Sequence, residues 1–283
     1  MKEFLSSISA LALVLAAATA HADKKSGTLN IAIAEQIEGV SPIYAPAGES
    51  QLYDRVVFDR LISFDPETGK FLPLLAKSWT QVDPTTWEFK LRGDVTFHDG
   101  SVFDADDAVY TLNWVSDPTV RFRLKNRFTW IKRTEKIDAH TLRIISKRPF
   151  ARALGLFAAN TPIFPSDVHN ALKTRSDFGR NPIATGAYRV VSLDKNSGIV
   201  LAARDDYVQA NKVRPVPSIK RVRIIPIPDE QTRIAKMLVG DVDVARLVSK
   251  DIGAQMAADR RFTVTSVNGL QYNYLYLDAA DRT

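Results

Sequence analysis

Apolar residues change their spacing repeatedly along this chain of 283 residues, and the spacing predicts its secondary structure. In the first half, period-two alternation predicts strands at residues 29–33, 87–91 and 142–144. Helical spacing of the apolar residues predicts a helix over 52–61, with Ser50 as its N-cap. The acidic residues at 104–107 predict the start of a second helix, because carboxylates are favoured at the positive end of the helix macrodipole.

The second half of the chain continues the same alternation. Strands are predicted at 187–193, 222–227, 242–245 and 272–277, and a helix is predicted at 229–239 that stops at Gly240. Residues 65–70 (DPETGK) lie between two apolar segments and have the composition of a hairpin turn. Strands interleaved with helices predict an α/β protein.

The first 22 residues have the pattern of a cleaved secretory signal. Lys2 supplies a short positive segment, residues 8–18 form an apolar run, and the overlapping small-x-small sequence ATAHA follows at 18–22. We expect cleavage after Ala22. A membrane anchor is the alternative, but a bilayer-spanning helix takes roughly 20 apolar residues and this run is shorter.

Composition excludes several kinds of site. The chain has no cysteine, so it forms no disulfide, thiolate metal site or lipidated N-terminal cysteine. Its 45% hydrophobic and 25% charged residues are typical of a globular protein with a sizeable core. The net charge of +6 is spread along the chain and therefore identifies no ligand.

Short motifs in a consistent order resemble those of the extracytoplasmic solute-binding proteins of ABC importers, in the peptide/nickel-binding family 5. Residues 73–79 (PLLAKSW) resemble the family's P-x-L-A-x-S-W, and 97–100 (FHDG) match its F-H-D-G. Residues 182–188 (PIATGAY) are similar to P-V-G-T-G-P-Y. Shorter matches occur at Ala105–Ala108 (ADDA), Asp206–Tyr207 (DY) and Gly240–Asp243 (GDVD).

The resemblance implies an α/β fold of the type II periplasmic binding protein class, in which two lobes close around a solute. After the predicted signal peptide at 1–22, it implies a discontinuous first lobe at 23–62 and 181–278 and an inserted α/β subdomain at 63–180. Residues 279–283 would begin the second lobe, which is largely missing. We therefore expect either a C-terminally truncated fragment or the product of a shortened gene.

The resemblance also implies a function. We expect a binding protein that captures peptides, or a similar small solute, and delivers them to an ABC permease in the inner membrane. Without a lipid tether, such a protein needs an enclosed space, so we expect it in a Gram-negative periplasm. A remnant without transport activity and an exported enzyme are the alternatives. Because two lobes normally share the solute, we expect residues 23–283 alone to bind it weakly.

Candidate solute contacts follow two strands of the first lobe, since open α/β sheets leave a crevice at the carboxyl ends of their strands. Gln36 and Ile37 would offer backbone hydrogen bonds, and Glu38 a charge for an amine. After the strand at 242–245, the candidates are Arg246, Leu247 and Val248. Arg246 would form a forked pair with a carboxylate. An ordinary surface loop is the alternative at both places.

No motif of a catalytic site occurs, so we expect no catalytic residue, no metal and no cofactor. His98 and Asp99 would be an acid-base or metal pair, but their place before a helix favours turn chemistry. Asp241 and Asp243 straddle an apolar residue, and capping or surface positions are favoured over catalysis.

One segment favours a different kind of partner. Residues 121–133 interleave six basic residues with aromatic ones, a pattern that binds nucleic acid through phosphates and stacked bases. The alternative is a loop and short helix with its charges in water. Because export makes nucleic acid an improbable partner, we favour the alternative and expect no nucleic-acid binding.

Overall fold

The computed structural model describes residues 27–266 of the chain, apart from positions 42, 46, 47, 160, 209 and 213. The predicted signal, its cleavage site after Ala22 and the predicted strand at 272–277 lie outside the described residues. The chain divides into two compact units, Met1–Arg246 and Leu247–Thr283. Every helix in the described ranges is too short or too polar to cross a membrane.

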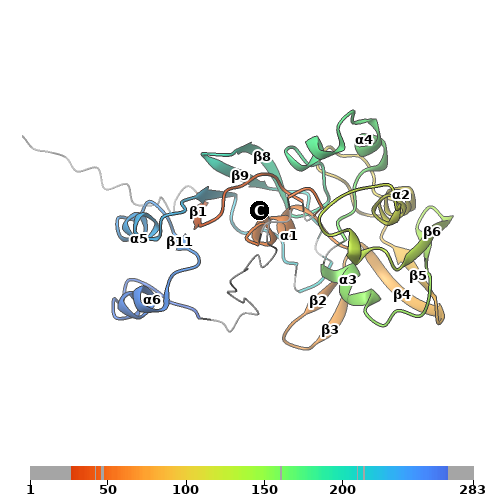
Figure 1. Cartoon of the computed structure of the whole chain (residues 1–283), viewed down its shortest axis with the longest axis horizontal. Coiled ribbons are helices and arrows are strands. Elements are labelled where there is room, and N and C mark those ends of the chain that lie inside the picture. Colours follow the sequence, from red (N-terminus) through yellow and green to blue (C-terminus); the bar gives the residue numbers. More distant parts are fainter. Residues whose placement is uncertain are drawn as a thin grey trace, which may run out of the picture. The chain divides into compact units, whose positions relative to one another are not determined.

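A mixed five-stranded sheet brings together segments from both ends of the first unit (Figure 1). Its order is β11-β1-β10-β9-β8, where β1 runs parallel to β10 and β11, and β9 runs antiparallel to β8 and β10. The strands are β1 (Thr28–Ile33), β8 (Tyr188–Asp194), β9 (Gly198–Ala203), β10 (Arg221–Pro226) and β11 (Val244–Ala245). The predicted strands at 29–33, 187–193 and 222–227 are confirmed within a residue, and the one at 242–245 is shorter than predicted.

A second, antiparallel sheet has the order β4-β5-β7-β6 and is built from one continuous stretch of the chain. A separate hairpin precedes it, with the predicted turn at 65–70 and Gly69 at φ 68°. The strands are β2 (Ile62–Asp65), β3 (Lys70–Pro73), β4 (Ala76–Asp83), β5 (Thr86–Leu91), β6 (Ile131–Asp138) and β7 (Thr141–Ser146).

The helices of the first unit are mostly short. They are α1 (Gln51–Val57), α2 (Ala105–Ser116), α3 (Ala153–Ala159), α4 (Ser166–Ala171) and α5 (Glu230–Leu238), with 3-10 turns η2 (Lys125–Arg127) and η3 (Arg175–Gly179). The second unit contains α6 (Lys250–Ala257). The prediction of a helix over 52–61 is wrong at its end, because α1 stops at Val57, and the Ser50 side chain makes no capping hydrogen bond.

Helix α2 begins with the acidic cluster that the sequence predicted, and its start is a capping box. The Asp104 side chain accepts a hydrogen bond from the Asp106 backbone, and the Asp107 side chain accepts one from the Asp104 backbone. Asp107 is buried and also accepts from the Ser166 backbone at 2.7 Å. The carboxylate therefore starts one helix and fixes the start of α4.

Several family-like motifs meet at a junction around Gly186. A Cβ atom on Gly186 would lie 2.4 Å from the Val57 carbonyl oxygen, so only glycine fits there. The Gly186 carbonyl accepts from Nε2 of His98 at 3.1 Å, and the Ala184 backbone N–H donates to Nδ1 of the same ring at 3.3 Å.

Arg204 forms a two-pronged pair with Asp206 and also donates to the Thr96 carbonyl. These motif residues thus hold the scaffold together.

Candidate functional site

Three parallel strands of the five-stranded sheet end at one edge. β10 and β11 flank β1, in registers that pair Ile33 with Pro226 and Ala32 with Ala245. Because parallel strands point the same way, the segments that follow them meet at this edge. We call residues 34–38, 227–229 and Arg246 the carboxyl edge. Ligands of open α/β sheets bind at such an edge.

The buried carboxylate of Glu49 fixes the segment that follows β1. Glu49 is 3% exposed, and its Oε2 accepts hydrogen bonds from the backbone N–H groups of Ala34 and Glu35, at 2.7 and 2.9 Å. In return, Oε2 of Glu35 accepts from the Glu49 backbone at 2.9 Å. These reciprocal bonds hold the first residues of the carboxyl edge in a defined conformation.

Arg246 supplies the positive charge of the carboxyl edge. Its backbone N–H donates to the Ala32 carbonyl at 3.1 Å, which extends the pairing of β11 with β1. Its guanidinium Nη1 lies 3.8 Å from Oε1 of Glu49, too far for a hydrogen bond. Oε1 is buried and has no hydrogen-bond partner among the described residues. The cation therefore compensates the Glu49 charge only in part.

The electrostatics around this edge are dominated by carboxylates. Tyr53, on the neighbouring helix α1, is 2% exposed. Burial raises the pKa of its phenol above the ordinary value, and the negative charges of Asp54, Glu35, Glu49 and Glu38 raise that pKa further. A group that carries positive charge is favoured in such surroundings.

The six predicted contacts are distributed unevenly. Gln36 and Glu38 are exposed, whereas the Ile37 side chain is fully buried in the core, which leaves only its backbone for a solute. Arg246 faces Glu49. Leu247 and Val248 begin the second compact unit and stay predictions; Leu247 is half exposed with φ 53°.

Sequence reasoning missed Glu49, the residue that joins the two predicted segments. Its signal in the sequence was weak. An acidic residue just before a helix has a local explanation, because it complements the macrodipole. Only the tertiary fold places this carboxylate against the backbone after β1 and beside Arg246.

Two histidines have lowered pKa values, and in each the ring is held by hydrogen bonds to neighbouring groups of the scaffold. His98 has backbone groups on both ring nitrogens, and burial lowers its pKa to about 4. His169 is fully buried between the Tyr44 hydroxyl, 2.5 Å from Nε2, and the Tyr110 hydroxyl, 2.7 Å from Nδ1. Burial, reinforced by the charge of Arg175, lowers the pKa of His169 to about 4. Both rings are therefore neutral connectors of the scaffold.

The aspartate pair at 241 and 243 is divided between two structural roles. Asp241 forms an exposed ion pair with Lys236 at 3.0 Å. Asp243 accepts from the Asn30 backbone at 2.8 Å and thereby joins β11 to β1. Within the part of the chain that the structure describes, no three His, Asp or Glu residues cluster in a way that could hold a metal ion.

The chain resembles known proteins both in sequence and in structure. Residues 70–282 match the sequence profile described as bacterial extracellular solute-binding proteins, family 5 middle. The chain is 25% identical, over 89% of its length and 48% of the relative's, to the glutathione-binding protein GsiB of Pectobacterium atrosepticum. It thus spans about half the length of the curated relatives it matches.

Solved structures resemble the chain over most of its length. NikZ from Campylobacter jejuni, solved in complex with Ni(L-His), has a TM-score of 0.74 and 26% identity, over 83% of this chain and 46% of that one. A dipeptide-binding protein from Pseudoalteromonas sp. SM9913, in complex with Met-Leu, has a TM-score of 0.75 over 82% of this chain and 50% of that one. At 21% identity, the second likeness shows the fold alone. The α/β fold of type II periplasmic binding proteins is therefore confirmed.

Proposed function

Because this chain belongs to family 5 of the bacterial extracellular solute-binding proteins, we propose that it captures a small solute with a protonated amine. Peptides are the proposed solute class. The protein would deliver its solute to an ABC permease in the inner membrane. The proposed compartment is the periplasm. Relatives of the same family carry names for the binding of small solutes, which supports a binding role over an enzymatic one.

The observation that carries the proposal is the buried, unpartnered oxygen of Glu49. The carboxyl edge together with Glu49 holds four carboxylates, those of Glu35, Glu38, Glu49 and Asp229, against the single guanidinium of Arg246, a difference of three negative charges. A buried carboxylate oxygen without a hydrogen bond is costly, and an ammonium group brings three donors. A peptide N-terminus supplies that group.

The remaining contacts follow from the chemistry of a peptide. Backbone groups of Gln36 and Ile37 are proposed to pair with the peptide backbone, which any sequence offers. Arg246 is 36% exposed, so its free donors can turn to a solute carboxylate while its backbone stays paired with β1. Capture would use hydrogen bonds and charge without a covalent step.

The two sheets support the proposed division of the chain. The five-stranded sheet takes strands from 28–33 and from 188–245, within the proposed first lobe of 23–62 and 181–278. The four-stranded sheet takes all its strands from 76–146, within the proposed subdomain of 63–180. We propose that the first lobe carries the solute contacts of this chain.

A titration followed by backbone NMR tests the amine requirement, since NMR detects millimolar binding. A dipeptide with a free amine is compared with its N-acetylated form. We expect shifts at residues 34–38 and Arg246 with the free amine only, and E49Q should abolish them. The control variant E135Q removes a carboxylate from an exposed ion pair with Arg133 and should respond like the wild type. Equal shifts with the acetylated peptide, or none at these residues, would contradict the proposal.

A further inference from the structure

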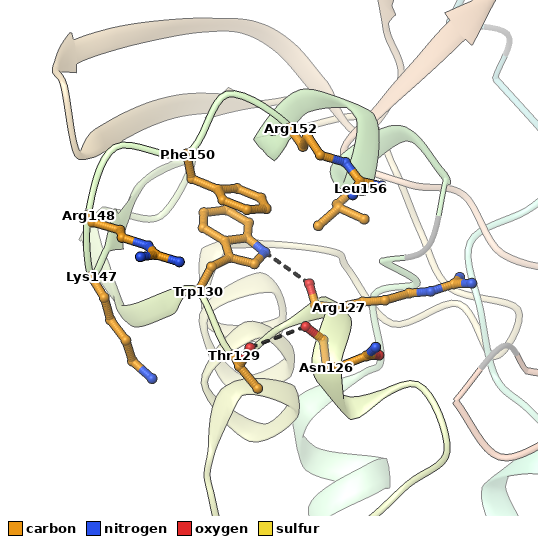
Figure 2. A pocket seen from close by; sticks show the side chains of 9 residues that line it. All are labelled: Asn126, Arg127, Thr129, Trp130, Lys147, Arg148, Phe150, Arg152 and Leu156. Carbon is orange, nitrogen blue, oxygen red and sulfur yellow. Dashed lines mark hydrogen bonds between the residues drawn. The ribbon is translucent and has the colours of Figure 1, made fainter.

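A basic pocket of about 500 Å³ lies at the open end of the β6–β7 hairpin (Figure 2). The pairing of the two strands continues past Ile131 and Ser146, since the Lys147 backbone donates to the Trp130 carbonyl at 2.9 Å. This pairing places η2 on one side of the pocket and the segment before α3 on the other. The residues that matter here are Arg127, Trp130, Lys147, Arg148, Phe150 and Arg152.

The pocket gathers positive charge without a counter-ion. Arg127, Lys147, Arg148 and Arg152 line it, and no acidic side chain does. None of the four forms an ion pair with a residue that the structure describes. Surface cations that serve only solubility are normally interspersed with acids, as Arg143 is with Glu88 on the same sheet. Packing alone does not explain this concentration of charge.

The neighbouring Lys125 is affected by the same charge. Its ammonium donates to the Val115 and Asp117 carbonyls, so backbone groups hold it in place. Burial lowers the pKa of Lys125, Asp117 opposes that change, and the positive charges of Arg121 and Lys147 lower the pKa further. The field of the basic residues in 121–133 thus extends into the pocket.

Two stacked aromatic rings form a rigid apolar wall beside these cations. The ring centroids of Trp130 and Phe150 are 4.5 Å apart, with planes inclined by 14°. Trp130 also packs against Phe157, with the ring centroids 5.5 Å apart, and its indole N–H donates to the Arg127 carbonyl at 2.9 Å. Figure 2 shows Arg148 and Arg152 on opposite sides of the stacked pair.

We propose that the basic pocket binds a small organic anion that combines at least two negative charges with an aromatic ring. Each guanidinium group can bind phosphate or carboxylate oxygens through two parallel hydrogen bonds. An aromatic ring stacks on aromatic side chains and covers apolar surface that a simple anion would leave in water. A volume of about 500 Å³ is within the range of small-molecule sites. The site is separate from the carboxyl edge and does not depend on the proposed solute.

Isothermal titration calorimetry of the whole chain with three probes tests this. ADP combines ring and charge, pyrophosphate supplies the charge, and adenosine supplies the ring. We expect ADP to bind more tightly than pyrophosphate or adenosine. Its affinity should fall as the salt concentration is raised. The double variant R148E/R152E should bind ADP at least about tenfold more weakly, because attraction becomes repulsion on both sides of the rings. F150A should lower the affinity for ADP without changing the affinity for pyrophosphate.

Matched variants separate the pocket from the net charge of the protein. R221E/R223E changes the net charge equally, on exposed positions of β10, and should leave the ADP affinity unchanged. E49Q, which alters the carboxyl edge, should also leave it unchanged. Thermal melts confirm that each variant is folded. Equal loss in R221E/R223E, pyrophosphate that binds as tightly as ADP, or no ADP binding would overturn the proposal. Binding of anionic lipid vesicles without binding of ADP would overturn it too.

Discussion

The ionised carboxyl group of Asp59 is predicted to lower the free energy of unfolding at neutral pH. Replacing the carboxyl by an amide, in D59N, measures the size of this effect. Asp59 is 4% exposed and accepts a hydrogen bond from the Tyr207 hydroxyl at 3.2 Å. Burial raises the pKa of Asp59 to about 6, although the charge of Arg214, the Tyr207 hydrogen bond and the charge of Arg60 act in the opposite direction. The protonated carboxyl is thus favoured by the folded state.

The size of the effect follows from the difference between the folded and unfolded pKa values. From 3.8 to about 6 is about two units, and each unit corresponds to about 1.4 kcal/mol, so the effect is about 3 kcal/mol. Because the folded pKa is the higher one, the stabilisation by Asp59 is complete below the unfolded value of 3.8 and is lost as the pH rises through about 6. D59N has no charge to lose and should keep its stability across this range.

Urea unfolding between about pH 4 and pH 7 measures the difference. Relative to the wild type, the free energy of unfolding of D59N should rise by about 2 kcal/mol across this range, because part of the effect is already lost at pH 4. His98 and His169 titrate in both proteins, so their effects cancel in the difference. D241N removes an exposed carboxylate and is the matched control, with a wild-type profile. A difference that stays constant with pH would instead mean that Arg214 keeps Asp59 ionised in the folded protein.

Three further substitutions, and one control, test the scaffold by urea unfolding. G186A should lower the free energy of unfolding by about 1–3 kcal/mol, because its Cβ would overlap the Val57 carbonyl; an unchanged value would contradict the close approach. The pKa of His169 is lowered from 6.5 to about 4, so the neutral ring stabilises the fold above pH 6.5 and this stabilisation is lost as the pH falls toward 4. Between these pH values, the free energy of unfolding of H169Q should therefore fall by about 3 kcal/mol less than that of the wild type. D107A should cost about 1–3 kcal/mol, since it leaves two partly buried N–H groups unpaired, whereas D106A removes only an exposed pair with Lys136, worth about 0–1 kcal/mol. Equal costs for these two would contradict the capping account.

The predicted elements succeed where one local rule decides the outcome. The acidic start of α2 and the turn at 65–70 are examples, because capping and turn chemistry act over a few residues. The predicted helix at 52–61 fails because the apolar spacing continues after the helix ends. Leu61 is buried in the core outside α1, and the buried Arg60 guanidinium turns back to the Phe58 carbonyl and the Asp54 carboxylate.

The basic stretch at 121–133 shows a similar mixture. The predicted short helix is present as η2, but the end of the stretch belongs to β6 rather than to a loop. Its pairing with β7 depends on residues ten and more positions away, which no local pattern specifies. The same holds for Glu49 and Arg246, which are distant in sequence and meet only when β1 and β11 pair. Contacts between distant segments are therefore where sequence reasoning fell short.

The proposed function depends on the carboxyl edge receiving the amine of a peptide. A dipeptide spin-labelled at its C-terminal residue tests the location most directly, through the broadening of backbone NMR signals at millimolar peptide. We expect distance-dependent broadening at residues 34–38 and Arg246, which is lost in E49Q and kept in E135Q. Broadening centred elsewhere, or equal broadening in E49Q, would contradict it.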